Sequence, residues 1–152
     1  MRKVEERAVS GFERVTLKDF GEVNISQGEN ESLTVEADEE ILPRIKTEVV
    51  DRGLVISVEG DWLRRISFGL EHFSGSAIRF HLQVRQLTGV EVMGACKMYA
   101  SRLETPNLDV KLAGAGSIEI GSLACTALNV TLPGAGKIEL AGTAESQDVQ
   151  LS

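Results

Sequence analysis

Two glutamates occupy equivalent positions in a pair of similar segments. Glu119 lies in GAGSIEI, and Glu139 lies 20 residues later in GAGKIEL. Paired carboxylates are the acid and base of many enzymes that cleave glycosidic bonds. A carbohydrate-binding or polysaccharide-active surface is therefore one hypothesis. A solvated row of acids is the simpler interpretation, because Tyr99 stands one spacing upstream, where a third acid would be expected.

The other reactive side chains form no catalytic or metal-binding motif. The chain has two histidines, His72 and His81, and two cysteines, Cys96 and Cys125. No nucleophile motif surrounds Cys96, and no CxxC, histidine pair or calcium-loop spacing is present. We expect no catalysis, no cofactor and no metal. We also expect the cysteines to stay unpaired, because they fall at different positions of the repeat described below.

The glycine-rich segments are predicted to be turns and not phosphate loops. A phosphate loop needs a glycine five residues before Gly136 and a hydroxyl side chain at the position of Ile138, and neither is present. Glycine also permits the positive φ that many tight turns require. We therefore expect each GAG segment to join two strands.

Residues 61–76 interrupt the strand pattern and are the best candidate for a binding loop. They combine large apolar side chains with basic ones, a mixture that is typical of binding hot spots. A loop that folds back to cover one end of the core would have the same composition, and we favour such a cap over an exposed loop. The candidate binding residues are Trp62, Arg64, Arg65, Phe68, His72 and Phe73.

An internal repeat organises the second half of the chain. Residues 108–124 and residues 128–144 match at nine of 17 positions, at an offset of 20 residues. Each copy carries two short runs in which apolar and polar residues alternate, the pattern of half-buried strands. Stacked copies would place Leu112 over Leu132 and Ile118 over Ile138. The sequence therefore predicts a parallel β-solenoid, or β-helix, with coils of about 20 residues over 77–152.

The first half is also rich in strand patterns but lacks this period. Residues 1–60 are expected to form an irregular β-rich part, with a hairpin over 45–58 in which Gly53 suits a left-handed turn position. In residues 77–84, Ile78, Phe80, Leu82 and Val84 share one face, which places His81 on the other face. We expect one all-β domain over 1–152.

Composition limits the partners of the chain. The 152 residues carry a net charge of −7, which disfavours binding to a phosphate backbone, so we expect no nucleic acid partner. No run of apolar residues is long enough for a membrane span. The first residues, MRKVEERAVSGF, lack the apolar run of an export leader.

The sequence resembles a known family. The segment VNISQGENESLTVEADEEIL, together with the repeated GAGSIEI and GAGKIELAGTA, is similar to the putative auto-transporter adhesin, head GIN domain family. The similarity covers nearly the whole chain. It implies a β-solenoid-like fold, a bacterial surface or periplasmic setting and no established activity, and it carries over no catalytic residues.

The last residues of the chain are the second candidate site. They resemble one more strand of the repeat without a charged or proline-containing edge, and such an edge invites another strand. We expect self-association there, through Asp148, Val149, Gln150 and Leu151. The leading functional hypothesis is a non-catalytic structural or adhesive module that presents a rigid β-surface to a surface glycan or protein. The alternatives are the glycan surface at Glu119 and Glu139 and an end-to-end self-assembling protein.

Overall fold

The computed structural model describes residues 2–18, 20–39, 41–58, 78–134 and 136–151, and within them twelve strands form one sheet. The first-half elements are β1 Arg2–Arg7, β2 Arg14–Leu17, β3 Phe20–Gln27, β4 Ser32–Asp38, the short 3-10 turn η1 Leu42–Arg44, β5 Ile45–Val50 and β6 Gly53–Val58. The second-half strands are β7 Arg79–Val84, β8 Gly89–Val92, β9 Ala95–Ala100, β10 Leu103–Leu112, β11 Ser117–Leu132 and β12 Lys137–Leu151.

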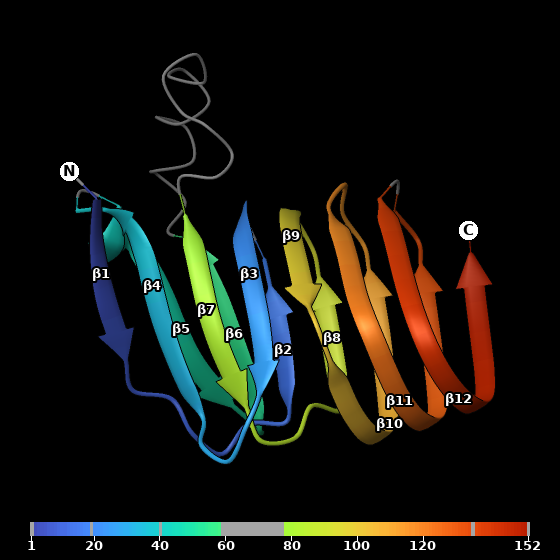
Figure 1. Cartoon of the computed structure of the whole chain (residues 1–152). Helices are drawn as coiled ribbons and strands as arrows, with labels where there is room; N and C mark the ends of the chain where they lie inside the picture. The colour runs from blue at the N-terminus through green and yellow to red at the C-terminus, as the bar shows by residue number, and fades with distance from the viewer. Residues whose placement is uncertain (1, 19, 40, 59–77, 135, 152) are drawn as a thin grey trace.

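The sheet folds back on itself into a nearly closed, barrel-like shape (Figure 1). Its strand order is β1-β4-β7-β3-β9-β11-β10-β8-β2-β6-β5, and β12 pairs with β11. We call the side formed by β4, β7, β3, β9 and the first parts of β11 and β12 the front wall. We call the side formed by β10, β8, β2, β6 and β5 the back wall. The long strand β11 belongs to both, because it pairs with β9 near its start and with β10 farther along.

The prediction of a parallel β-solenoid is wrong. Strand β4 runs antiparallel to both of its neighbours, β1 and β7, and β5 runs antiparallel to β6. A solenoid requires every stacked strand to run in the same direction, whereas here the chain reverses direction at both ends of the sheet. The all-β class was predicted correctly, but the strands form one mixed barrel-like sheet. The repeat determines which strands of the second half align and not how the sheet closes.

The two halves of the chain join in one sheet and do not form separate sheets. Strand β3 lies between β7 and β9 and is parallel to both. Strand β2 in the same way lies between β6 and β8. Strands from the two halves of the chain therefore pair with each other in both walls: they alternate across β4, β7, β3 and β9 of the front wall, and in the back wall they meet where β2 pairs with β8.

The 20-residue spacing appears as the register of parallel pairs. Val110 is opposite Val130, and Ile118 is opposite Ile138. The spacing shortens to 19 after a bulge, where Leu123 is opposite Gly142. Buried aliphatic side chains from both walls fill the space between them, since alternate residues of each strand point inward. Ile78, Phe80, Leu82 and Val84 are all buried and His81 is exposed, which confirms the predicted faces of β7.

The glycines of the repeated turns are required by close packing and not by positive φ. A Cβ atom on Gly116 would lie 1.9 Å from the carbonyl oxygen of Cys96, and one on Gly136 would lie 2.3 Å from the carbonyl oxygen of Gly116. Neither glycine has positive φ. Consecutive turns stack so closely that no side chain fits between them.

The hairpin predicted at 45–58 is present, but its left-handed residues differ from the prediction. Val50 is opposite Gly53, which leaves a two-residue turn at Asp51 and Arg52 with φ values of 50° and 64°. Both turn residues therefore take positive φ, as a hairpin turn of this length requires, and Gly53 begins β6.

Candidate functional site

The predicted binding loop cannot be placed. Trp62, Arg64, Arg65, Phe68, His72 and Phe73 all lie in residues 59–77, outside the described residues. Binding by this loop, or its role as a cap, stays a prediction.

Glu119 and Glu139 lie side by side, as the repeat predicted. They are opposite each other on β11 and β12, and both are exposed. The Nζ atom of Lys137 lies 2.6 Å from a carboxylate oxygen of Glu139. This hydrogen bond, together with the charge of Glu139, raises the pKa of Lys137. Glu139 is thus engaged in an exposed ion pair, and among the residues that the structure describes both acids face solvent.

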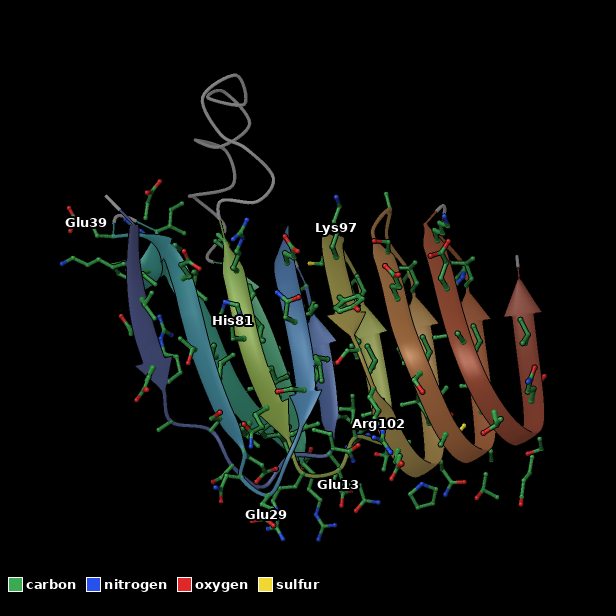
Figure 2. The ribbon with its side chains drawn as sticks, viewed as in Figure 1. Glu13, Glu29, Glu39, His81, Lys97 and Arg102 are labelled. Carbon is green, nitrogen blue, oxygen red and sulfur yellow. The ribbon has the colours of Figure 1, made fainter. Side chains whose placement is uncertain are left out.

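Glu119 and Glu139 are the last two members of a longer row of outward side chains across the front wall. Register places Thr34 of β4 opposite His81 of β7, and His81 opposite Asn24 of β3. Asn24 is opposite Tyr99 of β9, and Tyr99 is opposite Glu119. Figure 2 shows His81 on the outer surface of β7. We call Thr34, His81, Asn24, Tyr99, Glu119 and Glu139 the front row.

The front wall is hollowed where the front row crosses β3. A depression of about 350 Å³ is lined by outward side chains and by backbone of four adjacent strands. We call it the β3 hollow. Its lining residues are Asn24, Ile25, Ser26, Ser32, Thr34, His81, Leu82, Gln83, Tyr99 and Ser101.

Side-chain size explains the depression. Small or medium side chains, Asn24 and Ser26, project from the central strand β3. Larger ones, His81 and Gln83 on β7 and Tyr99 on β9, stand on either side. A sheet carries its side chains perpendicular to its surface, so short side chains between long ones produce a trough along the strand.

The floor of the β3 hollow is held from below by the core. The inward neighbours of the front row are Val35, Phe80, Val23 and Met98, and each is at most 2% exposed. These four pack beneath four adjacent strands whose backbones are paired throughout the hollow. Close-packed side chains and ladder hydrogen bonds together restrict motion, so the outward groups are held at fixed spacings.

A row of alternating charges flanks the front row. Glu36, Arg79, Glu22 and Lys97 are consecutive partners across β4, β7, β3 and β9. A carboxylate oxygen of Glu36 also lies 3.9 Å from Nε2 of His81. Because acid and base alternate along this row, the wall presents no single-sign field to a ligand.

The C-terminal candidate residues lie on an edge of the sheet. Strand β12 pairs with β11, and with no second strand among the residues that the structure describes. Val149 is 53% exposed and Asp148 is also exposed, while Gln150 and Leu151 belong to the same strand. Ile138 and Leu140 are only half-buried, whereas their partners Ile118 and Ile120 are 1% exposed. The core is therefore partly uncovered along β12.

A larger hollow lies at the end of the strands where β3 and β7 finish. It measures about 540 Å³ and is lined in part by Glu13, Glu31, Arg52 and Arg85. Figure 2 shows Glu13 and Glu29 at this end of the molecule, opposite Lys97. The lining mixes two acids with two bases, so its charge does not select one class of ligand.

The remaining reactive groups are separate from the β3 hollow. Neither Cys96 nor Cys125 forms a disulfide within the described residues, and burial raises the pKa of Cys125. Within the described residues, no group of three histidine, cysteine, aspartate or glutamate side chains is placed to hold a metal ion. The same part of the chain contains no helix that is long and apolar enough to cross a membrane.

Sequence reasoning missed most of the β3 hollow. His81 was assigned to the correct face and Tyr99 to the correct position in the repeat, but Asn24, Ser26 and Gln83 were not singled out. Each shows the polar-outward alternation of a strand. No local signal indicates that β3 lies between β7 and β9, because the three strands are far apart in the sequence.

Solved structures share this fold. A putative adhesin from Bacteroides fragilis is 22% identical with a TM-score of 0.82, covering 99% of this chain and 69% of that one. A putative lipid binding protein from Parabacteroides distasonis is 19% identical with a TM-score of 0.76, covering 99% and 60%. A putative adhesin from Parabacteroides merdae is 16% identical with a TM-score of 0.66, covering 99% and 69%. The chain thus spans 60–69% of these proteins, and at such identities the likeness shows the fold alone.

A family match settles the classification that the sequence motifs suggested. No curated protein matches the chain. The model of the family described as "Putative auto-transporter adhesin, head GIN domain" matches residues 11–152, which include β2 to β12. The chain belongs to this family of adhesin-like domains of unknown role.

Proposed function

We propose that this domain is a non-catalytic adhesive module that binds a partner on its front wall. The observation that carries the proposal is the front row, six outward side chains held in register on paired strands over a closely packed core. Membership of an adhesin-like family supports the same function. Glu119 and Glu139 contribute to this surface as exposed polar groups and not as an acid and base.

Adhesion can be tested with beads that carry the purified protein. We expect the beads to be retained under flow on at least one of three surfaces: mucin, collagen or fixed bacterial cells. The variant Tyr99→Ala/His81→Ala should lose most of this retention. The control Asn107→Ala/Lys111→Ala truncates exposed side chains of β10 away from the front wall and should behave as wild type. Retention on none of the surfaces, or equal loss in both variants, would contradict the proposal.

Self-association through β12 is a second candidate function. It is supported by the unpaired edge of β12 among the described strands and by the half-buried Ile138 and Leu140 beneath it. Such an edge offers backbone donors and acceptors to an added strand. A two-fold dimer is the simplest arrangement, since the same edge then serves both copies.

A further inference from the structure

We propose that the β3 hollow binds a neutral carbohydrate, with one sugar ring seated over β3 beside the ring of Tyr99. This inference rests on the proposed adhesive function, because it names the ligand class of the same wall. It differs from the hypothesis of a site at Glu119 and Glu139, since its central residues are Asn24 and Tyr99 and it involves no cleavage.

The dimensions of the hollow suit a single ring. Neighbouring strands are about 4.8 Å apart, so β7 and β9 lie roughly 10 Å apart with β3 between them. The long side chains of Gln83 and Tyr99 stand on these outer strands, and Asn24 and Ser26 form the lower middle. The volume of about 350 Å³ is near the lower end of the range for small-molecule sites.

The position of Gln83 is itself set by the packing of the hollow. A Cβ atom on Gly28 would lie 2.4 Å from Nε2 of Gln83, so the absence of a side chain at Gly28 leaves space for the amide. Gln83 therefore lies over the end of β3, at the margin of the β3 hollow.

The polar groups of the hollow match hydroxyl groups. An amide side chain both donates and accepts hydrogen bonds, and so does a serine or threonine hydroxyl. A sugar hydroxyl has the same double capacity. In the part of the chain that the structure describes, the side-chain amide of Asn24 makes no hydrogen bond to protein. It is therefore available to a ligand. The amide and hydroxyl side chains that line the β3 hollow are those of Asn24, Ser26, Ser32, Thr34, Gln83 and Ser101.

Tyr99 supplies the apolar part of the site. It is 41% exposed, and it stands beside Asn24 in the front row. The face of an aromatic ring carries partial negative charge and attracts the partly positive C–H groups of an apolar surface. A pyranose ring has one face of C–H groups and a rim of hydroxyls. It can thus contact Tyr99 with its face while its rim reaches the amides and hydroxyls.

The surrounding charges favour a neutral sugar over an acidic one. The flanking row alternates Glu36, Arg79, Glu22 and Lys97, so no cluster of basic groups is available for a carboxylate or sulfate. Glu119 is the next member of the front row beyond Tyr99 and adds negative charge at that side. An anionic sugar would be repelled there, whereas a neutral one would find a further hydrogen-bond acceptor.

The test is a titration of isotope-labelled protein followed by amide NMR shifts. The neutral probes are cellohexaose, mannohexaose and the hexamer of N-acetylglucosamine, and the acidic probe is tetragalacturonate. We expect at least one neutral probe to bind, with shifts concentrated in β3, β7 and β9. We expect no binding of tetragalacturonate.

Variants separate the role of the aromatic ring from a loss of folding. Tyr99→Ala should weaken binding about tenfold, because the ring contact is lost. Tyr99→Phe retains the ring and should bind within about threefold of wild type. Asn24→Ala should also weaken binding, and Lys111→Ala on β10 should not. A thermal melt of each variant shows that it is folded.

Three results would overturn the inference. They are no binding of any neutral probe at millimolar concentration, binding of the acidic probe alone, and equal affinity of Tyr99→Ala and wild type. Bead retention distinguishes this failure from a failure of the proposed function. If beads adhere through the front wall while the protein binds no sugar, the adhesive function stands and the carbohydrate site is refuted. Sugar binding without bead retention would leave the carbohydrate site standing and refute the adhesive function.

Discussion

Equivalent positions of the repeat are buried to different extents. The same substitution should therefore lower the free energy of unfolding by different amounts at the two positions. Ile118 and Ile138 are opposite each other on β11 and β12, but Ile118 is 1% exposed and Ile138 is half-buried. Replacing isoleucine with alanine removes three carbon groups, each worth about 0.8 kcal/mol when fully buried. At Ile118 this gives about 2.4 kcal/mol, and the cavity left behind adds about 1 kcal/mol.

The cost at Ile138 should be roughly half as large. Part of its surface is already in contact with water, so the transfer free energy falls to about 1.5–2 kcal/mol. No closed cavity forms, because that side of the core is open. The difference of about 1.5 kcal/mol corresponds to roughly 3–6 °C in melting temperature for a chain of this size.

Thermal and urea unfolding of the two variants measure this difference. Glu119→Ala, next to Ile118 on β11, serves as the control, because its side chain is exposed and its removal should change stability by less than about 0.5 kcal/mol. Equal destabilisation by Ile118→Ala and Ile138→Ala would refute the reasoning. It would mean that the β12 side of the core is covered in solution, and dilution of the sample would then show whether a second copy covers it.

Three further predictions concern the edge, an ion pair and the thiols. Light scattering over a concentration series should show self-association, and Val149→Lys should abolish it because the lysine adds charge to the β12 edge; a monomer at every concentration would contradict the β12 proposal. Glu139→Gln should lower the pKa of Lys137 toward its ordinary value in a side-chain NMR titration, whereas Glu104→Gln, which removes the partner of Arg102, should not. Since the pKa of Lys137 is raised, any stability from this pair is present below the ordinary lysine pKa and is lost as pH rises through the folded value; an unchanged midpoint in Glu139→Gln would show that the pair does not form. A thiol assay of denatured, unreduced protein should find two thiols per chain, and fewer would indicate a disulfide.

The faces of individual strands could be predicted because they depend on local alternation. In β7, the inward set Ile78, Phe80, Leu82 and Val84 and the outward His81 follow directly from the period of two. The alignment of β11 with β12 was equally accessible, since a 20-residue repeat places Ile118 beside Ile138. Each of these features can be predicted from one strand or from two similar segments alone.

The closure of the sheet could not be predicted because it depends on pairs without sequence similarity. Nothing in β4 indicates that it runs antiparallel to β7, and a parallel neighbour would show the same alternation. The position of β3 between β7 and β9 depends on the path of the whole chain. The repeat of the second half therefore indicated how its own strands align, but not that strands of the first half pair with them in one mixed sheet.

The same limit explains why the best candidate site was missed. Asn24 is an ordinary outward residue of β3, and Tyr99 in isolation is a substitution within the repeat. They become neighbours only because β3, from the first half, pairs with β9 from the second. The hollow then results from side chains of unequal length on three adjacent strands, which no single segment displays. A site of this kind depends on strand order, so exchanging Asn24 for a bulky side chain should close it without disturbing the inward faces of β3, where Val23 and Ile25 remain buried.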